Sequence, residues 1–405
     1  MRKRILLVFI LAALWLGAGH NVRAGSGVEI TPQPPEYTFG DKITFRATLT
    51  SDIPPQDIKL IIETPGASSF LGAAEFIPPD HTVYIYSLTN RPLRAFSTVV
   101  YRYRVKLENE EVYTSPDFSF RYLDNRYTWQ ELEDDAFLVS WYEGEVTFAQ
   151  EILDTAQAGL ERFEVLLPNA KEDGRVDIYA YSSASELQST LLMSGQTWVA
   201  GHADPELGAI VVSLPPGPER SLEIDRQVPH ELAHILLYRI MGEEYQNLPQ
   251  WLNEGIASQM ETFPNPDYSL YLEEAYEEGN LIPIEELCLI FPSDAATSFL
   301  AYAEATSLTG YIKDYYGAEG IRNLISAYEL GLECNRGVEV ALERDLRQLE
   351  GDWQKAIFDS ASNQFIEASL TFLPWLVIFG AIFSPLIGFV VLRGLKTKYI
   401  ERGDK

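Results

Sequence analysis

The chain has 405 residues, of which 46% are hydrophobic and 22% are charged. This length exceeds what one hydrophobic core usually serves, so we expect two folded domains together with targeting segments. The composition is that of an ordinary globular protein and excludes a disordered chain or a protein that crosses a membrane many times. The formal net charge of −28 argues against nucleic acid as a partner.

Residues 1–24 have the pattern of a secretory signal peptide. A short basic start precedes an apolar run from Ile5 to Leu16, and a small-residue exit ends at Ala24, after which we predict cleavage. The alternative is an uncleaved N-terminal anchor, but the apolar run is shorter than the roughly 20 residues that a span needs. Either way, we expect the bulk of the chain to cross the membrane.

A second apolar segment lies near the C-terminus. Residues Phe372–Leu392 include no charged residue, and the segment is long enough to cross a hydrocarbon core of about 30 Å. The tail at 393–405 is rich in Lys and Arg, which the positive-inside rule assigns to the cytoplasm. The sequence therefore predicts a single-pass protein of the cell membrane, with one transmembrane helix and an extracytoplasmic main portion.

Residues 25–123 have the pattern of an all-β domain. Short runs of strand-forming residues are separated by turn residues and prolines, which remove no ladder hydrogen bond at those positions. In Thr98–Val105, apolar or aromatic residues alternate with polar ones, as expected for a half-buried antiparallel strand. We therefore predict an immunoglobulin-like β-sandwich, which positions the second domain or binds an envelope partner. The cysteine framework of antibody domains is absent, so the likeness is one of architecture.

Residues 130–365 change to a mainly helical pattern. Gly144–Leu167 shows helical periodicity, and two short strands are predicted at Arg175–Ala180 and Gly208–Leu214. Helical patterns then dominate to about Ser369. The predicted fold class is α+β: a β-sandwich, a mainly helical domain and one transmembrane helix.

The chain has two cysteines, Cys288 and Cys334. An even count permits one disulfide in an oxidising compartment, but the sequence does not show whether the two Cα atoms lie close enough. Neither cysteine has the close spacing of a cysteine zinc site.

The stretch His230-Glu231-Leu232-Ala233-His234 carries the strongest chemical signal. On a helix, the two histidines stand one turn apart on the same face, so both imidazoles can bind one cation while Glu231 points beside it. The chain has five histidines, which makes chance a poor explanation for this motif. Two histidines that merely fill a helix face would not explain the glutamate between them.

A third ligand is expected on a following helix, and Trp251-Leu252-Asn253-Glu254-Gly255 supplies a carboxylate. Two histidines and one glutamate leave an open position on a zinc ion, which is the arrangement of catalytic rather than structural zinc sites. We therefore predict one zinc ion bound by His230, His234 and Glu254.

These two segments resemble the gluzincin metallopeptidases, the clan of thermolysin and the zinc aminopeptidases, and most closely the peptidase-MA-like domains of bacterial membrane proteins. The resemblance covers roughly residues 130–360. It implies that His230, His234 and Glu254 bind zinc and that Glu231 is the catalytic base. The Gly-x-Met-Glu-Asn element by which zinc aminopeptidases hold a free amine is absent upstream, which argues against exclusive aminopeptidase activity.

Other candidates in this region carry weaker signals. By the same resemblance, Trp198–Ala203 leads into Gly208–Ser213, which is similar to the edge strand that pairs with extended substrate, although an ordinary sheet edge explains it equally well. Ser298–Thr306 resembles the helix behind the metal, and Tyr302 is the candidate donor to the oxyanion, with Tyr311 as an alternative. The chain has 22 tyrosines, so a core or surface role is open for each. His202 is a further candidate polar group, with a loop role as the alternative.

The sequence therefore predicts a membrane-anchored zinc metallopeptidase. A zinc-bound water, activated by Glu231 as general base, would hydrolyse peptide bonds of a peptide or protein substrate. Two rival hypotheses stay open: a non-catalytic envelope binding or scaffold protein with a vestigial zinc site, and a zinc hydrolase of a non-peptide substrate. The sequence leaves the oligomeric state open.

Overall fold

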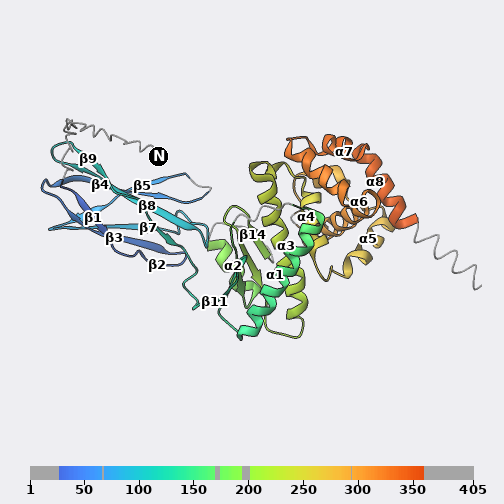
Figure 1. Ribbon diagram of the computed structural model, residues 1–405, viewed down its shortest axis with the longest axis horizontal. Helices are drawn as coiled ribbons and strands as arrows, with labels where there is room; N and C mark the ends of the chain where they lie inside the picture. The colour runs from blue at the N-terminus through green and yellow to red at the C-terminus, as the bar shows by residue number, and fades with distance from the viewer. Residues whose placement is uncertain (1–26, 66–67, 169–173, 194–200, 293, 360–405) are drawn as a thin grey trace, which may run out of the picture. The chain divides into compact units, whose positions relative to one another are not determined.

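A computed structural model of the chain describes residues 27–65, 68–168, 174–193, 201–292 and 294–359 (Figure 1). The described residues form two compact units. The first comprises the residues through Arg126 together with Met193, and the second begins at Tyr127. The domain limits predicted from the sequence, 25–123 and 130–365, stay a prediction.

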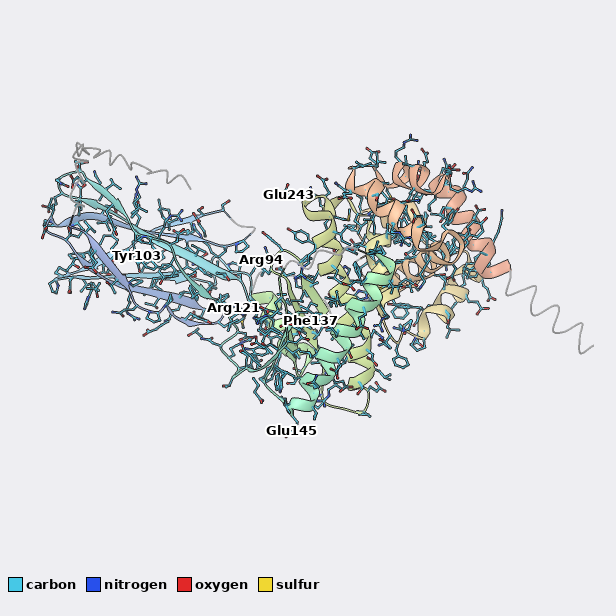
Figure 2. All side chains as sticks on the ribbon, in the orientation of Figure 1. Arg94, Tyr103, Arg121, Phe137, Glu145 and Glu243 are labelled. Atoms are coloured by element: carbon cyan, nitrogen blue, oxygen red, sulfur yellow. A yellow bond between two sulfur atoms is a disulfide. The ribbon has the colours of Figure 1, made fainter. Side chains whose placement is uncertain are left out.

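The first unit consists of two antiparallel sheets that enclose one core. The first sheet has the order β1-β3-β7-β6 with β2 beside β3, and the second has the order β10-β8-β4-β5 with β9 beside β8. In β8 nearly every second residue is buried, including Tyr103, which lies among the strands in Figure 2. The strands are Glu29–Pro32 (β1), Glu36–Thr38 (β2), Lys42–Thr50 (β3), Pro55–Glu63 (β4), Phe70–Ala73 (β5), Glu75–Ile77 (β6), His81–Ser87 (β7), Thr98–Leu107 (β8), Val112–Thr114 (β9) and Phe118–Arg121 (β10).

The second unit begins with a mixed sheet of order β11-β12-β13-β15-β14. The three central strands are parallel, and the two outer strands are antiparallel to their neighbours. The strands are Gln130–Glu133 (β11), Phe137–Trp141 (β12), Val176–Tyr181 (β13), Gly201–Asp204 (β14) and Ala209–Ser213 (β15). Every residue of β12 and β15 is buried, as expected for parallel strands covered on both faces.

The position of β15 corrects one prediction. Residues Gly208–Ser213 were expected to form the edge of the sheet, but β15 lies between β13 and β14, and β14 is the edge strand. The physical reason is that β15 is apolar on both faces and therefore belongs inside a sheet.

Helices supply the rest of the second unit. In Figure 1, α1 and α3 run beside the sheet, and α4 to α8 follow on the side away from it. The α-helices are Val146–Leu166 (α1), Ala184–Met193 (α2), Arg220–Met241 (α3), Gln250–Met260 (α4), Asp267–Glu278 (α5), Ala295–Glu329 (α6), Cys334–Leu342 (α7) and Leu346–Gln354 (α8). The short turns Gly242–Asn247 (η1), Ile284–Cys288 (η2) and Lys355–Asp359 (η3) complete the unit.

Glycines allow two close helix contacts that fix α3 and α4. A Cβ at Gly159 of α1 would lie 3.1 Å from Pro229 Cβ, which stands inside α3. A Cβ at Gly255 of α4 would lie 2.0 Å from Thr309 Oγ1 of α6, so any larger residue there forces the two helices apart. Close packing at these glycines therefore fixes the positions of α3, which carries the histidine motif, and α4, which carries Glu254.

The two cysteines are paired. Cys288 at the end of η2 and Cys334 at the start of α7 form a disulfide across 46 residues of sequence. The bond closes a loop that contains all of α6.

One finding contradicts two predictions: the fold class with a transmembrane helix, and the cell-membrane location that was based on it. In the part of the chain that the structure describes, no helix combines the length and the apolarity that a membrane span requires. The long helices carry charges along their length, such as Glu151 and Asp154 in α1 or Asp225 and Arg226 in α3. The segments predicted as signal peptide (1–24), span (372–392) and tail (393–405) lie outside the described residues.

Candidate metal centre

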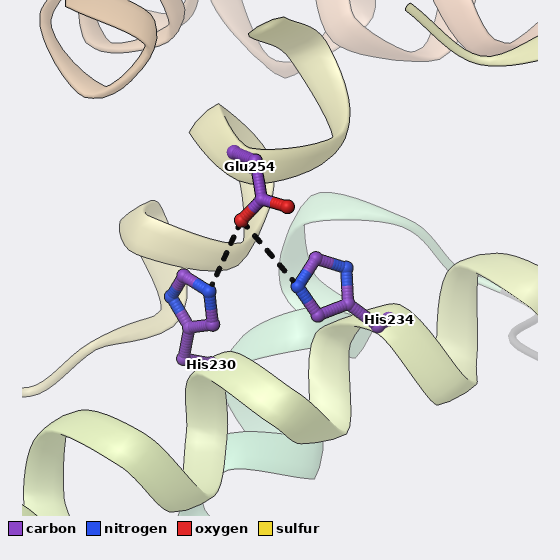
Figure 3. Close-up of side chains that lie close together, drawn as sticks. All are labelled: His230, His234 and Glu254. Atoms are coloured by element: carbon purple, nitrogen blue, oxygen red, sulfur yellow. Dashed lines mark ion pairs between the residues drawn. The ribbon is translucent and has the colours of Figure 1, made fainter. Parts of the chain in front are cut away.

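His230, His234 and Glu254 converge where α3 and α4 pack together (Figure 3). Glu254 Oε2 lies 3.3 Å from His230 Nε2 and 3.6 Å from His234 Nε2. One potential ligand atom from each residue lies within 4.8 Å of the others. Within the described residues, this is the one group of at least three His, Cys, Asp or Glu side chains with that geometry.

The cluster is largely removed from solvent, and its chemistry fits a divalent transition metal. The side chains of His230, His234 and Glu254 are 14%, 11% and 9% exposed. Two imidazole nitrogens and one carboxylate oxygen are the donor set of a zinc site with an open position. Buried carboxylates need a compensating cation, and a zinc ion held by these three residues would provide it.

A second layer of polar groups holds each potential ligand. His230 Nδ1 donates to Glu261 Oε1 at 3.0 Å, and His234 Nδ1 donates to Asn253 Oδ1 at 3.0 Å. Gln250 Nε2 donates to Glu254 Oε1 at 2.7 Å. With Nδ1 of each neutral ring engaged in this way, Nε2 keeps the lone pair that a metal requires.

Two of these supporting groups are themselves fixed. Asn253 Nδ2 donates to the hydroxyl of Tyr245 at 3.0 Å, which orients the amide so that Oδ1 faces His234. Glu261 is 8% exposed, and its Oε2 has no hydrogen-bond partner. No motif in the sequence predicted Asn253, Gln250, Tyr245 and Glu261 as parts of the site. The position of Asn253, directly before Glu254, was the one available signal.

The charges in the cluster shift its titration. Burial opposes the imidazolium form of His230, but hydrogen bonds with Glu254 and Glu261 outweigh burial and raise the pKa of His230 to about 10. Burial disfavours the charged form of Glu254, yet the neighbouring His234 and His230 hold the pKa of that carboxyl below its usual value. The pocket therefore favours a positive charge in contact with Glu254.

Glu231 lies between the cluster and the edge of the sheet. A Cβ added to Gly201 of β14 would come within 2.5 Å of Glu231 Oε1, so the carboxylate rests against bare backbone. Since β14 is the edge strand, its outer backbone groups face away from the sheet beside this carboxylate. His202 follows on the same strand opposite Val211 and is not part of the ligand group.

Of the two tyrosine candidates, Tyr302 lies within reach of the cluster's charges. Burial, followed by the negative charges of Glu254 and Glu231, raises the pKa of the Tyr302 hydroxyl. Burial raises the pKa of Tyr311 to about 12, and the groups that act on it are Tyr316 and Asp352 rather than the cluster.

Tyr268 of α5 is a further hydroxyl near the cluster that the sequence analysis missed. Burial, followed by the charge of Glu261, raises its pKa. The charge of Glu254 acts in the same direction, whereas Arg226 opposes it.

A comparison with known families gives a match that covers the cluster. A family model described as the Peptidase MA superfamily matches residues 155–359, which include α3, α4 and the whole cluster. No curated protein matches the chain.

Three solved structures are distantly similar to parts of this chain. BhCBM56 is 8% identical over 24% of this chain and 92% of its own, with a TM-score of 0.19. A carbohydrate-binding module of family 56 that binds β-1,3-glucan is 11% identical over 23% of this chain and 99% of its own, with a TM-score of 0.18. The sensor domain of the anti-sigma factor RsgI4 of Pseudobacteroides cellulosolvens is 16% identical over 25% of this chain and 98% of its own, with a TM-score of 0.19. Scores this low carry no argument about this chain.

Proposed function

Because the chain belongs to the Peptidase MA superfamily, through a match over residues 155–359, we propose that it is a zinc-dependent peptidase with its active site between α3, α4 and β14. The observation that carries this proposal is the convergence of His230, His234 and Glu254, with Glu231 beside them. Three protein ligands leave one zinc position for water or substrate, which is the hallmark of a catalytic site.

In this proposal the three metal ligands, Glu231 and Gly201 have different roles. Zinc, when bound by His230, His234 and Glu254, would acidify a water and polarise a peptide carbonyl. Glu231 takes a proton from the attacking water and passes it to the leaving amine, as a general base and then a general acid. Gly201 lets Glu231 stand against the edge strand, so the base lies beside any peptide that pairs with β14.

The supporting residues keep this geometry. Glu261 and Asn253 hold the two imidazole rings so that both Nε2 atoms point to one place. Tyr302 is the candidate hydroxyl that donates a hydrogen bond to the developing oxyanion, since the cluster's carboxylates already act on it.

The test compares the full-length chain with its Glu231→Gln and His230→Ala variants. We expect wild type and Glu231→Gln to bind one zinc and His230→Ala to lose it, as measured by metal analysis after dialysis. On a mixed peptide library, only wild type should cleave. A Glu231→Gln variant that still cuts would refute the assignment of the base. Zinc binding without cleavage by wild type would favour a scaffold or a non-peptide hydrolase.

A further inference from the structure

We propose that a cavity beside the metal cluster receives a lysine or arginine side chain of the substrate, so that the enzyme cuts next to a cationic residue. The inference rests on the proposed peptidase function and adds a substrate class to it. It stands on a cavity between α2, the end of β15 and the first turns of α3.

The cavity lies on the same face of α3 as the proposed base. Glu223, Gln227 and Glu231 follow at intervals of four residues, so their side chains stack along one side of the helix. One such interval advances about 6 Å along a helix. Since α3 packs against both β14 and β15, a peptide that pairs with β14 beside Glu231 brings its neighbouring side chain over Gln227.

The cavity is large enough for one long side chain. Its volume is about 400 Å³, and its described lining includes Gln188 of α2, Ser213 of β15, the prolines at 215, 216 and 218, and Glu219, Glu223 and Gln227. The prolines provide an apolar wall, which suits the aliphatic stem of lysine or arginine.

Gln227 is a lining residue of the cavity whose side-chain amide is fixed by two hydrogen bonds. Its Nε2 donates to the backbone oxygen of Ser213 at 3.2 Å and to Glu223 Oε2 at 2.9 Å. Both partners can only accept, so the amide orientation is determined, and Oε1 is left buried without a partner. The amide of Gln227 is therefore held in one orientation in the cavity lining.

The balance of charge also favours a cation. Glu219 and Glu223 line the cavity, and Glu223 already accepts a hydrogen bond from Arg226 at 3.1 Å. The basic lining residue is Arg220, whose guanidinium lies over the Phe148 ring at 4.3 Å. Because this stacking holds Arg220 on α1, the carboxylate of Glu219 at the start of α3 is the group that a bound cation would meet.

The test is a charge swap at Glu219, which is exposed and makes no side-chain cap to α3. Matched peptides that differ only by Lys, Leu or Glu at one position flanking the cut are compared for kcat/KM. We expect wild type to favour Lys over Leu by about 1.5-fold to fivefold, the range of a partly exposed charge pair. Glu219→Lys should remove that preference and improve the Glu peptide, while Glu277→Lys, an equal charge change on exposed α5, should leave it intact.

A second readout does not depend on turnover. The zinc-loaded Glu231→Gln protein, alone and with Glu219→Lys added, is titrated with the same acetylated, amidated peptides by calorimetry. Tighter binding of the Lys peptide that Glu219→Lys abolishes supports the cavity, even if wild type cuts nothing and the peptidase assignment fails. Equal binding of the Lys and Leu peptides, or the same loss in Glu277→Lys, overturns the inference whether or not peptides are cut.

Discussion

Replacing Glu304 by Gln should stabilise the second unit at alkaline pH. Glu304 of α6 is 1% exposed, its Oε1 accepts a hydrogen bond from Ile282 N at 2.8 Å, and its Oε2 has no partner. Burial raises the pKa of this carboxyl to about 8; the Ile282 hydrogen bond opposes the shift, and the charge of Glu350 adds to it. The folded chain therefore keeps a proton on Glu304 at neutral pH.

The magnitude follows from linkage between protonation and folding. An unfolded glutamate loses its proton near pH 4.5, whereas folded Glu304 holds it to about pH 8. The folded state binds more protons between these values. The contribution of Glu304 to stability is therefore highest below pH 4.5 and falls as pH rises from 4.5 to about 8. At about 1.4 kcal/mol per pH unit, the total loss is roughly 5 kcal/mol as an upper value. Glutamine cannot ionise and avoids this loss, but its buried amide N–H groups cost about 1–3 kcal/mol.

The assay is urea unfolding from pH 4.5 to 8.5, followed by tryptophan fluorescence. Of the seven tryptophans in the sequence, all but Trp15 follow residue 126, so the signal reports mainly on the second unit. We expect Glu304→Gln to be more stable than wild type by about 2–4 kcal/mol at pH 8.5, with the difference shrinking or reversing at pH 4.5. Exposed Glu277→Gln is the control and should show no such trend. A stability difference for Glu304→Gln that does not change with pH would refute the reasoning.

Three further changes have definite expected outcomes. Glu261→Gln should weaken zinc binding by about tenfold to a hundredfold in a chelator competition, because His230 loses its charged hydrogen-bond partner. Gly255→Ala should lower the free energy of unfolding by about 1–3 kcal/mol in the same urea assay, since the added methyl meets Thr309 on α6. Replacing Cys288 and Cys334 together by Ala should lower it by about 4 kcal/mol, the loop-closure term for their sequence separation of 46.

Each of these has an outcome that contradicts it. Unchanged zinc affinity in Glu261→Gln would mean that the backbone alone orients His230. A Gly255→Ala variant as stable as wild type would show that α4 and α6 can separate without loss. If the double cysteine variant unfolds like the oxidised wild type, the disulfide contributes nothing to the stability of the second unit.

The local part of the candidate site could be predicted from the sequence. The four-residue spacing of His230 and His234 already determines that both rings share one face of a helix. Glu254 was predicted from the residues that surround it in the sequence. Its distance from α3 could not be predicted, because that distance depends on how α4 packs. Glu261 shows the limit of this reasoning, since no local pattern says that a residue just beyond α4 returns to His230.

Elements of the fold that have a local sequence pattern could be predicted. Alternation indicated strands such as β8, where one face of the strand is buried. The edge of the mixed sheet in the second unit was misplaced, because β15 is uniformly apolar and its short neighbour β14 has no distinctive alternation. The transmembrane prediction rested on hydropathy alone, and none of the described helices matches it.

The contact between Gly201 and Glu231 has a consequence for judging relatives by their motifs. A single methyl group at position 201 would collide with the proposed base while leaving His230, His234 and Glu254 untouched. A chain with that change would keep its three metal-ligand residues and its full signature, yet the carboxylate of its proposed base would have to move. Under the proposed function, the residue at position 201, which lies outside the histidine motif, therefore helps to determine whether a relative with the same motifs is active.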